Sequence, residues 1–147
     1  MAETKICIPG LNVQWPWSQL ILEGKKTIET RSYPLPSSYR GMPIAVIETP
    51  GQDPSSPVRT AQIIGIVIFS DSFQYTTHRA WLRDQQHHLV PEGHKLFGYK
   101  KSKTKWGWRI KSIQTFSEPQ RAPKHRGIVF TKTCHLKVPI ISALSSG

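Results

Sequence analysis

The residues with the clearest chemical potential lie in one eight-residue stretch that begins at Gly24. Its alternating, β-branched character predicts a strand, with Thr27, Glu29 and Arg31 on one face. Lys26 can join that face because the chain is still turning after Gly24. A carboxylate beside a lysine can act as an acid or a base, and a guanidinium offers planar donors to a phosphate or a base edge. The stretch therefore predicts a binding or catalytic centre.

The same residues also have a purely structural interpretation. Exposed pairs of an arginine and a carboxylate are common and contribute little to stability. Glu29 and Arg31 could pair in this way across the surface of a sheet, with Lys25 and Lys26 simply solvated. Spacing alone leaves both interpretations open.

Basic residues are concentrated in the second half of the chain, which has 147 residues and a formal net charge of +11. Residues 1–75 carry six basic and six acidic side chains. Residues 76–137 carry fourteen Lys and Arg against three Asp and Glu, together with all six His. A one-sided excess of this size is typical of proteins that bind nucleic acid, and less often of those that bind an acidic membrane or protein surface. We therefore expect nucleic acid as the partner.

Several cations and one tryptophan are candidates for contacts with that partner. The residues predicted to follow its phosphates are Arg79, Arg83, Lys100, Lys101, Lys103, Lys105, Arg109 and Lys111. The run over residues 99–105 also has a weak likeness to a nuclear-import signal, and a solvated loop explains it equally well. Trp15 and Trp17 flank Pro16 and cannot both face a core easily. One of them, with Trp15 as the candidate, could therefore stack on an unpaired base.

The elements that would position these residues are mostly strands. Strands are predicted at residues 26–31, 43–48, 61–69, 106–116 and 127–134, a short strand and helix over residues 12–24, and a helix from Thr77 to about His88. Trp106 and Trp108 would form a core pair beneath the basic face of their strand. Strands and helices do not alternate as βα units, which argues against a doubly wound parallel sheet. The order predicts an α+β fold, a mixed β-barrel of about five to six strands with two or more short helices.

Length and composition predict a single domain over residues 1–147, with a core over about 5–134 and a tail over about 138–147. No apolar run is long enough to span a membrane, and the N-terminal residues do not resemble a secretion signal. Cys7 and Cys134 are too few and too far apart for a disulfide scaffold or a zinc finger, and two buried thiols are the default expectation. We expect an intracellular, reducing compartment: the cytoplasm, or the nucleus in a eukaryote.

No cofactor and no metal are expected. His87, His88 and His94 do not match a common zinc spacing, and the two cysteines are distant in sequence. Phosphate-binding loops, dinucleotide fingerprints and the serine-hydrolase elbow are absent from the sequence.

One family shares the most characteristic of these patterns. Residues 11–31 resemble the opening of the ASCH domain (activating signal cointegrator homology), whose hallmark G-x-K-x-x-E-x-R falls on Gly24, Lys26, Glu29 and Arg31. Further support comes from Ile64 and Gly65, from Trp106-Gly-Trp108 and from the closing Arg126-Gly-Ile-Val-Phe130. The resemblance covers roughly residues 5–134. It implies a PUA-like β-barrel with a cleft, lined by the hallmark strand and proposed to bind RNA.

The resemblance also implies two kinds of enzyme as alternatives. One branch of the family is similar to amidohydrolases that deacetylate N4-acetylcytidine with a lysine, a threonine three residues later and a glutamate. Lys26 matches the lysine, but Glu29 stands at the threonine position, so the nucleophile is missing. Other members resemble ribonucleases, for which Lys26, Glu29 and Tyr33 could serve as cation, base and positioning hydroxyl. The leading prediction is thus binding of RNA or single-stranded nucleic acid in a basic cleft lined by the G-x-K-x-x-E-x-R segment. The alternative is a small hydrolase of RNA or of a modified nucleoside, and the third is a protein-interaction module.

Overall fold

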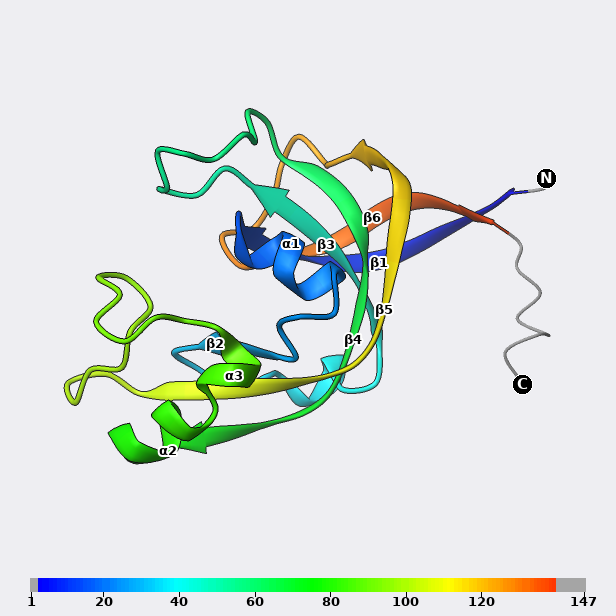
Figure 1. Ribbon diagram of the computed structural model, residues 1–147. Helices are drawn as coiled ribbons and strands as arrows, with labels where there is room; N and C mark the ends of the chain where they lie inside the picture. The colour runs from blue at the N-terminus through cyan, green and yellow to red at the C-terminus, as the bar shows by residue number, and fades with distance from the viewer. Residues whose placement is uncertain (1–2, 140–147) are drawn as a thin grey trace.

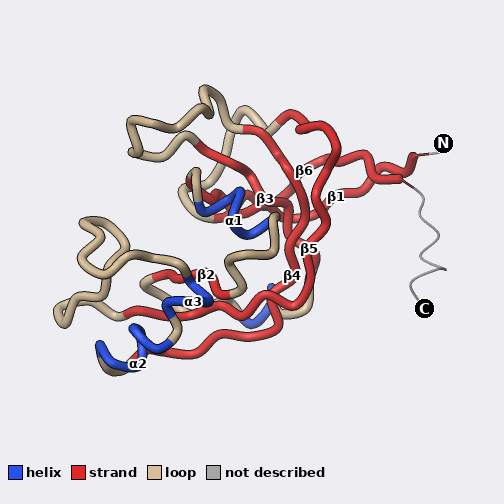
Figure 2. The backbone as a smooth tube through the Cα atoms, in the orientation of Figure 1, coloured by secondary structure: helices blue, strands red, loops and turns tan. Residues whose placement is uncertain are grey.

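The computed structural model describes residues 3–139, which form one mixed six-stranded sheet with short helices beside it (Figures 1 and 2). The strands are β1 (Glu3–Gln14), β2 (Ile28–Arg31), β3 (Pro43–Thr49), β4 (Gln62–Tyr75), β5 (Lys105–Arg121) and β6 (Phe130–Pro139). The helices are α1 (Trp17–Leu22), α2 (His78–Arg83) and α3 (Gln85–His88), with one 3-10 turn, η1 (Ser37–Tyr39). The predicted α+β class is confirmed. Residues 140–147 of the predicted tail lie outside the described residues.

The sheet curls strongly, although its backbone ladder does not close into a barrel. Its strand order is β2-β5-β4-β3-β1-β6, with β1 and β3 parallel and every other pair antiparallel. The ladder between β4 and β5 contains irregularities around Gly65 and Phe69, and such bulges bend a strand. Both strands accordingly sweep around the molecule in Figure 1.

A side chain joins β5 to the far edge of the sheet. The amide of Gln120 donates to the carbonyl of Lys137 at 2.8 Å and accepts from its backbone N–H at 2.9 Å. Gln120 lies near the end of β5, where β2 no longer pairs, and Lys137 lies on the edge strand β6. The predicted barrel is therefore approximate: the curled sheet is bridged by a side chain at this point.

Apolar side chains from the strands and from α1 form the core. One cluster brings Leu11, Val46, Phe69 and Trp108 together with α1, and Trp108 is fully buried, whereas Trp106 is only partly buried. Ile21 and Leu22 anchor α1 to this cluster. The predicted core role is confirmed for Trp108.

The absence of a side chain at Gly65 allows α1 to approach the sheet. A Cβ atom at Gly65 would lie 2.4 Å from the carbonyl oxygen of Gln114 and 2.8 Å from the side chain of Leu22. Such distances are too short for any larger residue, so the glycine sets the distance between β4, β5 and α1.

The single helix predicted from Thr77 to His88 is wrong in one respect, because the structure has two short helices there. Thr77, where the predicted helix begins, caps α2, since its Oγ1 accepts from the N–H of Ala80 at 3.0 Å. At Asp84 the backbone leaves helical geometry, with φ −94° and ψ 9°. The Asp84 carboxylate accepts a 2.7 Å hydrogen bond from the hydroxyl of Tyr75 on β4. This long-range hydrogen bond accompanies a break that helical periodicity did not reveal.

Strand boundaries differ from the predictions wherever a partner strand continues the pairing. The prediction begins the first strand near Asn12, but β1 begins at Glu3 because that segment pairs with β6. The apolar run ends near Phe69, yet β4 continues to Tyr75 along β5. Pairing with a neighbour thus stabilises polar segments as strands.

Two further findings concern classes of protein that the sequence disfavoured. Within residues 3–139 no helix is both long and apolar enough to cross a bilayer. In the same part of the chain, no three His, Cys, Asp or Glu side chains gather as a set of metal ligands. Cys134 is buried as expected, whereas Cys7 is exposed; both are free thiols.

Candidate functional site

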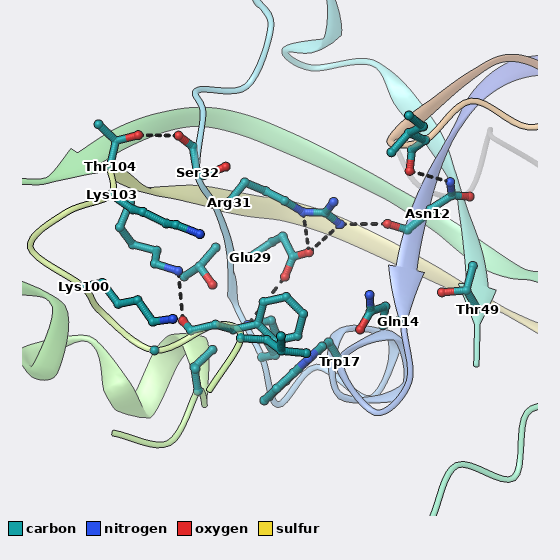
Figure 3. A pocket seen from close by; sticks show the side chains of 18 residues that line it. Asn12, Gln14, Trp17, Glu29, Arg31, Ser32, Thr49, Lys100, Lys103 and Thr104 are labelled. Atoms are coloured by element: carbon teal, nitrogen blue, oxygen red, sulfur yellow. Dashed lines mark hydrogen bonds and ion pairs between the residues drawn. The ribbon is translucent and has the colours of Figure 1, made fainter. Parts of the chain in front are cut away.

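A pocket of about 420 Å³ opens where β2, the C-terminal ends of β1 and β3, and the segment between α3 and β5 meet (Figure 3). Its lining residues are Asn12, Gln14, Trp17, Lys26, Glu29, Thr30, Arg31, Ser32, Thr49, Val90, Leu96, Phe97, Gly98, Lys100, Lys103, Thr104, Lys105 and Ile128. The hallmark residues Lys26, Glu29 and Arg31 therefore line one cavity.

Lys26 is buried because the chain turns sharply between α1 and β2. Gly24 adopts a left-handed φ of +77°, and the N–H of Lys26 then bonds to the carbonyl of Leu20 at 2.9 Å. The Lys26 side chain is only 1% exposed, with its Nζ 3.6 Å from Glu29 Oε1 and donating to the carbonyl of His88. The Nζ also lies 5.2 Å from the centre of the Trp17 ring. The interpretation of Lys26 as a solvated surface residue is wrong.

Glu29 and Arg31 form a tight pair at the base of the pocket. Glu29 Oε2 accepts a hydrogen bond from Arg31 Nε at 3.0 Å and forms an ion pair with Arg31 Nη2 at 2.8 Å, while the same Nη2 donates to the carbonyl of Asn12 at 2.8 Å. Figure 3 shows the guanidinium of Arg31 reaching from β2 to Asn12 on β1. The side chains are 7% and 18% exposed, so the expectation of an exposed pair is wrong. The Arg31 donors predicted to meet a ligand are largely used inside the protein.

Burial and the local charges change the pKa values of the basic groups. Desolvation lowers the pKa of the Lys26 amine from 10.5 to about 8, although the carboxylate of Glu29 opposes this shift. Desolvation also works against the charge of Arg31, but Glu29, with a smaller contribution from Tyr33, raises the pKa of its guanidinium. Burial lowers the pKa of Lys105, with the charges of neighbouring lysines acting in the same direction. Lys26 can thus lose a proton close to neutral pH.

His88 holds the backbone that supports Lys26. Its Nδ1 accepts from the N–H of Val90 at 3.0 Å, so its Nε2 carries the proton and donates to the carbonyl of Trp81 at 2.8 Å. The imidazole is fully buried and stacks on the Trp81 ring at 4.5 Å. Burial lowers its pKa to about 4, which keeps the ring neutral. His88 is therefore a fixed structural support for the carbonyl that receives the lysine.

Lysines surround the rest of the pocket. Lys105 is 8% exposed and donates to the carbonyl of Phe97 at 2.9 Å, whereas Lys100 and Lys103 are exposed at the rim. Five cations and one carboxylate occur among the described residues that line the cavity. The pocket is thus strongly cationic, with its charges at two depths.

Six of the predicted site residues line the pocket: Lys26, Glu29, Arg31, Lys100, Lys103 and Lys105. The other seven, Trp15, Tyr33, Arg79, Arg83, Lys101, Arg109 and Lys111, do not. Tyr33 packs its ring against Trp108, at 5.8 Å between centroids. Arg109 pairs with Asp71 at 2.8 Å and lies over the ring of Phe73.

Exposed positions outside the pocket account for most of the rest. Arg79 and Arg83 project from α2, Lys101 lies on the loop before β5, and Lys111 lies on β5. Trp15 lines a second, separate pocket. These residues could still contact a long ligand, but they do not belong to the cavity around Lys26.

Several lining residues were not anticipated. Asn12 and Gln14 reach the pocket from β1, and Asn12 Oδ1 is buried without a hydrogen-bond partner among the described residues. Leu96 and Ile128, exposed by 49% and 96%, add apolar surface. These residues come from segments far from β2 in sequence, so no local pattern connects them with Lys26.

Comparison with known proteins identifies the fold. No protein-family model matches the chain, and no curated protein matches it either. Among solved structures, the ASCH protein of Zymomonas mobilis aligns with a TM-score of 0.64 at 19% identity, over 84% of this chain and 85% of that one. A serine-to-alanine variant of that protein gives the same TM-score and identity over 84% and 86% of the two chains. A tyrosine-to-phenylalanine variant gives 0.59 at 20% identity over 76% and 73%. The chain thus has the fold of an ASCH protein, as its G-x-K-x-x-E-x-R segment predicts.

Proposed function

We propose that this protein binds RNA or single-stranded nucleic acid and accepts one unpaired nucleotide in the pocket around Lys26. The observation that carries the proposal is the cationic lining: Lys26, Arg31 and three further lysines face one carboxylate, Glu29. An anionic ligand would offset the excess positive charge. The volume of about 420 Å³ lies within the range of small-molecule sites and suits a single nucleotide.

The inner part of the pocket suits the base of a nucleotide, and the lysines at its rim suit the phosphate. Trp17 and Phe97 supply aromatic surface for the apolar faces of a base, while Asn12 and Gln14 supply amide groups for its polar edge. Lys100 and Lys103 are exposed at the rim, where a phosphate would stay partly solvated. Phosphate contacts of this kind would contribute affinity without selecting a sequence.

Charge reversal at the rim tests the proposal. Replacing Lys100 and Lys103 by Glu should weaken binding of a fluorescent single-stranded RNA at least tenfold and flatten its salt dependence, by roughly 0.7 in slope for each phosphate that is no longer neutralised. The matched control replaces Lys5 and Lys137, which are exposed cross-strand partners on β1 and β6, and changes the net charge equally. Equal losses of affinity in both variants, or an affinity independent of salt, would contradict a localised site.

A hydrolase is the second candidate, and one observation favours it. The Lys26 amine, with a pKa lowered to about 8 by burial, lies 3.6 Å from a Glu29 oxygen. Such an amine could exchange protons with a bound water at neutral pH. Thr27 is exposed and contacts His87 Nδ1 at 3.3 Å, and it does not line the pocket. A covalent route through Thr27 therefore has no support. Because Glu29 stands at the position where the related amidohydrolases have their threonine, we expect any turnover to proceed by direct attack of water.

N4-acetylcytidine distinguishes the two candidates. Attack of water on its acetyl carbon would break the C–N bond and release acetate and cytidine. We expect no cytidine and no acyl adduct in mass spectra of quenched incubations. Rapid release of cytidine that is abolished by Lys26→Ala would instead establish the hydrolase.

A further inference from the structure

A second pocket, of about 570 Å³, lies beside the first and is not explained by it. It is built from the C-terminal ends of β1 and β3, from α1, from the segment between β3 and β4, and from the start of β4. Its lining residues are Trp15, Gln19, Glu48, Pro57, Val58, Arg59, Thr60 and Gln62.

Glu48 is the distinctive feature of this pocket. It is only 6% exposed, and its Oε2 accepts hydrogen bonds of 2.7 Å from Ser18 Oγ and from Gln19 Nε2. Its Oε1 has no hydrogen-bond partner among the described residues. Glu48 Oε1 remains accessible to solvent, and because Glu48 lines the pocket, this oxygen can accept a hydrogen bond from a ligand there. A carboxylate only accepts hydrogen bonds, so it selects a ligand that brings N–H donors.

Trp15 and Arg59 add two further kinds of interaction. Trp15 is partly buried, and its backbone N–H is held by the carbonyl of Thr49 at 2.9 Å, which places the indole at the pocket. Arg59 lies on the connection between β3 and β4, lines the pocket and is exposed. An aromatic ring, an acceptor and a cation together match a nucleobase that carries an amino group and is followed by a phosphate.

The two pockets are one residue apart along two paired strands. Gln14 and Thr49 are cross-strand partners and line the first pocket. Trp15 and Glu48, their immediate chain neighbours, line the second. Successive side chains of a strand point to opposite faces, so the two pockets lie on either side of the same strand ends, and a nucleic-acid strand that passes over these ends can enter both with adjacent nucleotides.

We propose that the Trp15–Glu48 pocket binds a second nucleobase of the same strand and prefers an amino-bearing base to uracil. This inference rests on the proposed function, because the first nucleotide brings the second within reach. The base stacks on Trp15, and its amino group donates to Glu48 Oε1. Cytosine and uracil have nearly the same shape, but cytosine presents an amino donor where uracil presents a carbonyl acceptor, which the carboxylate disfavours.

Calorimetric titration with the four 5′-mononucleotides and with every dinucleotide containing C or U at either position tests this. We expect the best C-containing dinucleotide to bind about tenfold more tightly than the best mononucleotide, the effect of one stacked base. We also expect about tenfold selection of C over U at the second position. Trp15→Ala should remove the gain from the second base and leave mononucleotide affinity unchanged. Glu48→Gln should retain the gain and remove the selection.

Thermal melts of both variants exclude unfolding as the cause, and Trp15→Phe, which keeps an aromatic face, should retain most of the gain. If mononucleotides bind but a second base adds nothing, or if Glu48→Gln still selects C, the second pocket is not a base site and the first proposal stands. If neither mononucleotides nor dinucleotides bind, both proposals are wrong.

Discussion

Two arginine–carboxylate pairs in this protein have the same length and very different surroundings. Arg31 Nη2 lies 2.8 Å from Glu29 Oε2, and Arg109 Nη1 lies 2.8 Å from Asp71 Oδ2. The side chains of the first pair are 18% and 7% exposed, and those of the second are 50% and 42% exposed. The distances alone would suggest that the two ion pairs contribute equally to stability.

The two pairs differ in how well water solvates their charges. In the exposed pair, water solvates both charges whether or not they meet, so the ion pair changes the stability little. In the buried pair, each charge depends more on its partner, because less solvent can take the place of a missing partner. Glu29 in addition lies 3.6 Å from the buried Lys26. The buried pair is thus part of a network of charges on which both the fold and the pocket depend.

The largest effect should come from removing the shared carboxylate. Glu29→Gln leaves the charges of Lys26 and Arg31 buried without compensation, and should lower the free energy of unfolding by about 3–5 kcal/mol. Urea denaturation followed by circular dichroism measures this loss of stability. A change below about 1 kcal/mol, the range of exposed pairs, would mean that water reaches the network and that the two pairs are equivalent.

Lys26 should give the next largest effect, visible as a dependence on pH. Its folded pKa of about 8 lies below the unfolded value of 10.5, so between these values the unfolded chain binds more protons and stability rises with pH. The gain attributable to Lys26 is about 3 kcal/mol at most, at about 1.36 kcal/mol per pKa unit. It should be complete above pH 10.5 and absent below about pH 8.

Comparison with Lys26→Met isolates this gain from other titrating groups. The difference in unfolding free energy between the two proteins, measured from about pH 7 to pH 10.5, should move in favour of the natural protein as pH rises. A constant difference would show that Lys26 titrates at its ordinary pKa.

Arg31→Lys should have an intermediate effect. A lysine keeps the charge, but its single ammonium cannot bond to Glu29 as Arg31 Nε does and also reach the carbonyl of Asn12 as Nη2 does. We expect the free energy of unfolding to fall by about 1.5–3 kcal/mol, the contribution of a hydrogen bond to a charged group. Chemical denaturation at neutral pH checks it, and stability equal to that of the natural protein would mean that charge alone matters at this position.

The smallest effect should come from the exposed pair. Arg109→Ala should change stability by no more than about 1 kcal/mol, most of it because the guanidinium no longer covers the ring of Phe73. The same measurement in about 1 M salt should reduce even this difference, because salt screens exposed charges. A destabilisation as large as that of Glu29→Gln would overturn the distinction drawn between the two pairs.

Features that depend on residues close together in the sequence were predicted correctly, and features that depend on distant residues were not. The turn at Gly24, the strand after it, the cap at Thr77 and the core role of Trp108 depend on local pattern and were predicted. The break between α2 and α3 at Asp84 involves a hydrogen bond from the distant Tyr75, and it was not predicted. Local rules therefore placed the elements, while partners from elsewhere in the chain set their limits.

The two neighbouring tryptophans show the same division within the site. Their arrangement around Pro16 indicated that they could not share one environment. Only the packing of α1 decided that Trp17 lines the pocket with Lys26 and that Trp15 lines the pocket with Glu48. The order of residues in the sequence does not indicate which pocket each tryptophan ring lines.

By itself, the sequence determined the α+β class, the placement of Glu29 and Arg31 on a short strand with Lys26 just before it, and the excess of positive charge in the second half of the chain. Only the tertiary structure decided that Lys26 and Glu29 are buried and that Arg31 is partly buried. The carbonyl that receives Lys26 belongs to His88, 62 residues away, and the carbonyl beside Arg31 belongs to Asn12 on another strand. Desolvation and Coulomb energy depend on all neighbours in space, whereas spacing along the chain records only the nearest ones. The lowered pKa of Lys26 is therefore a property of the fold.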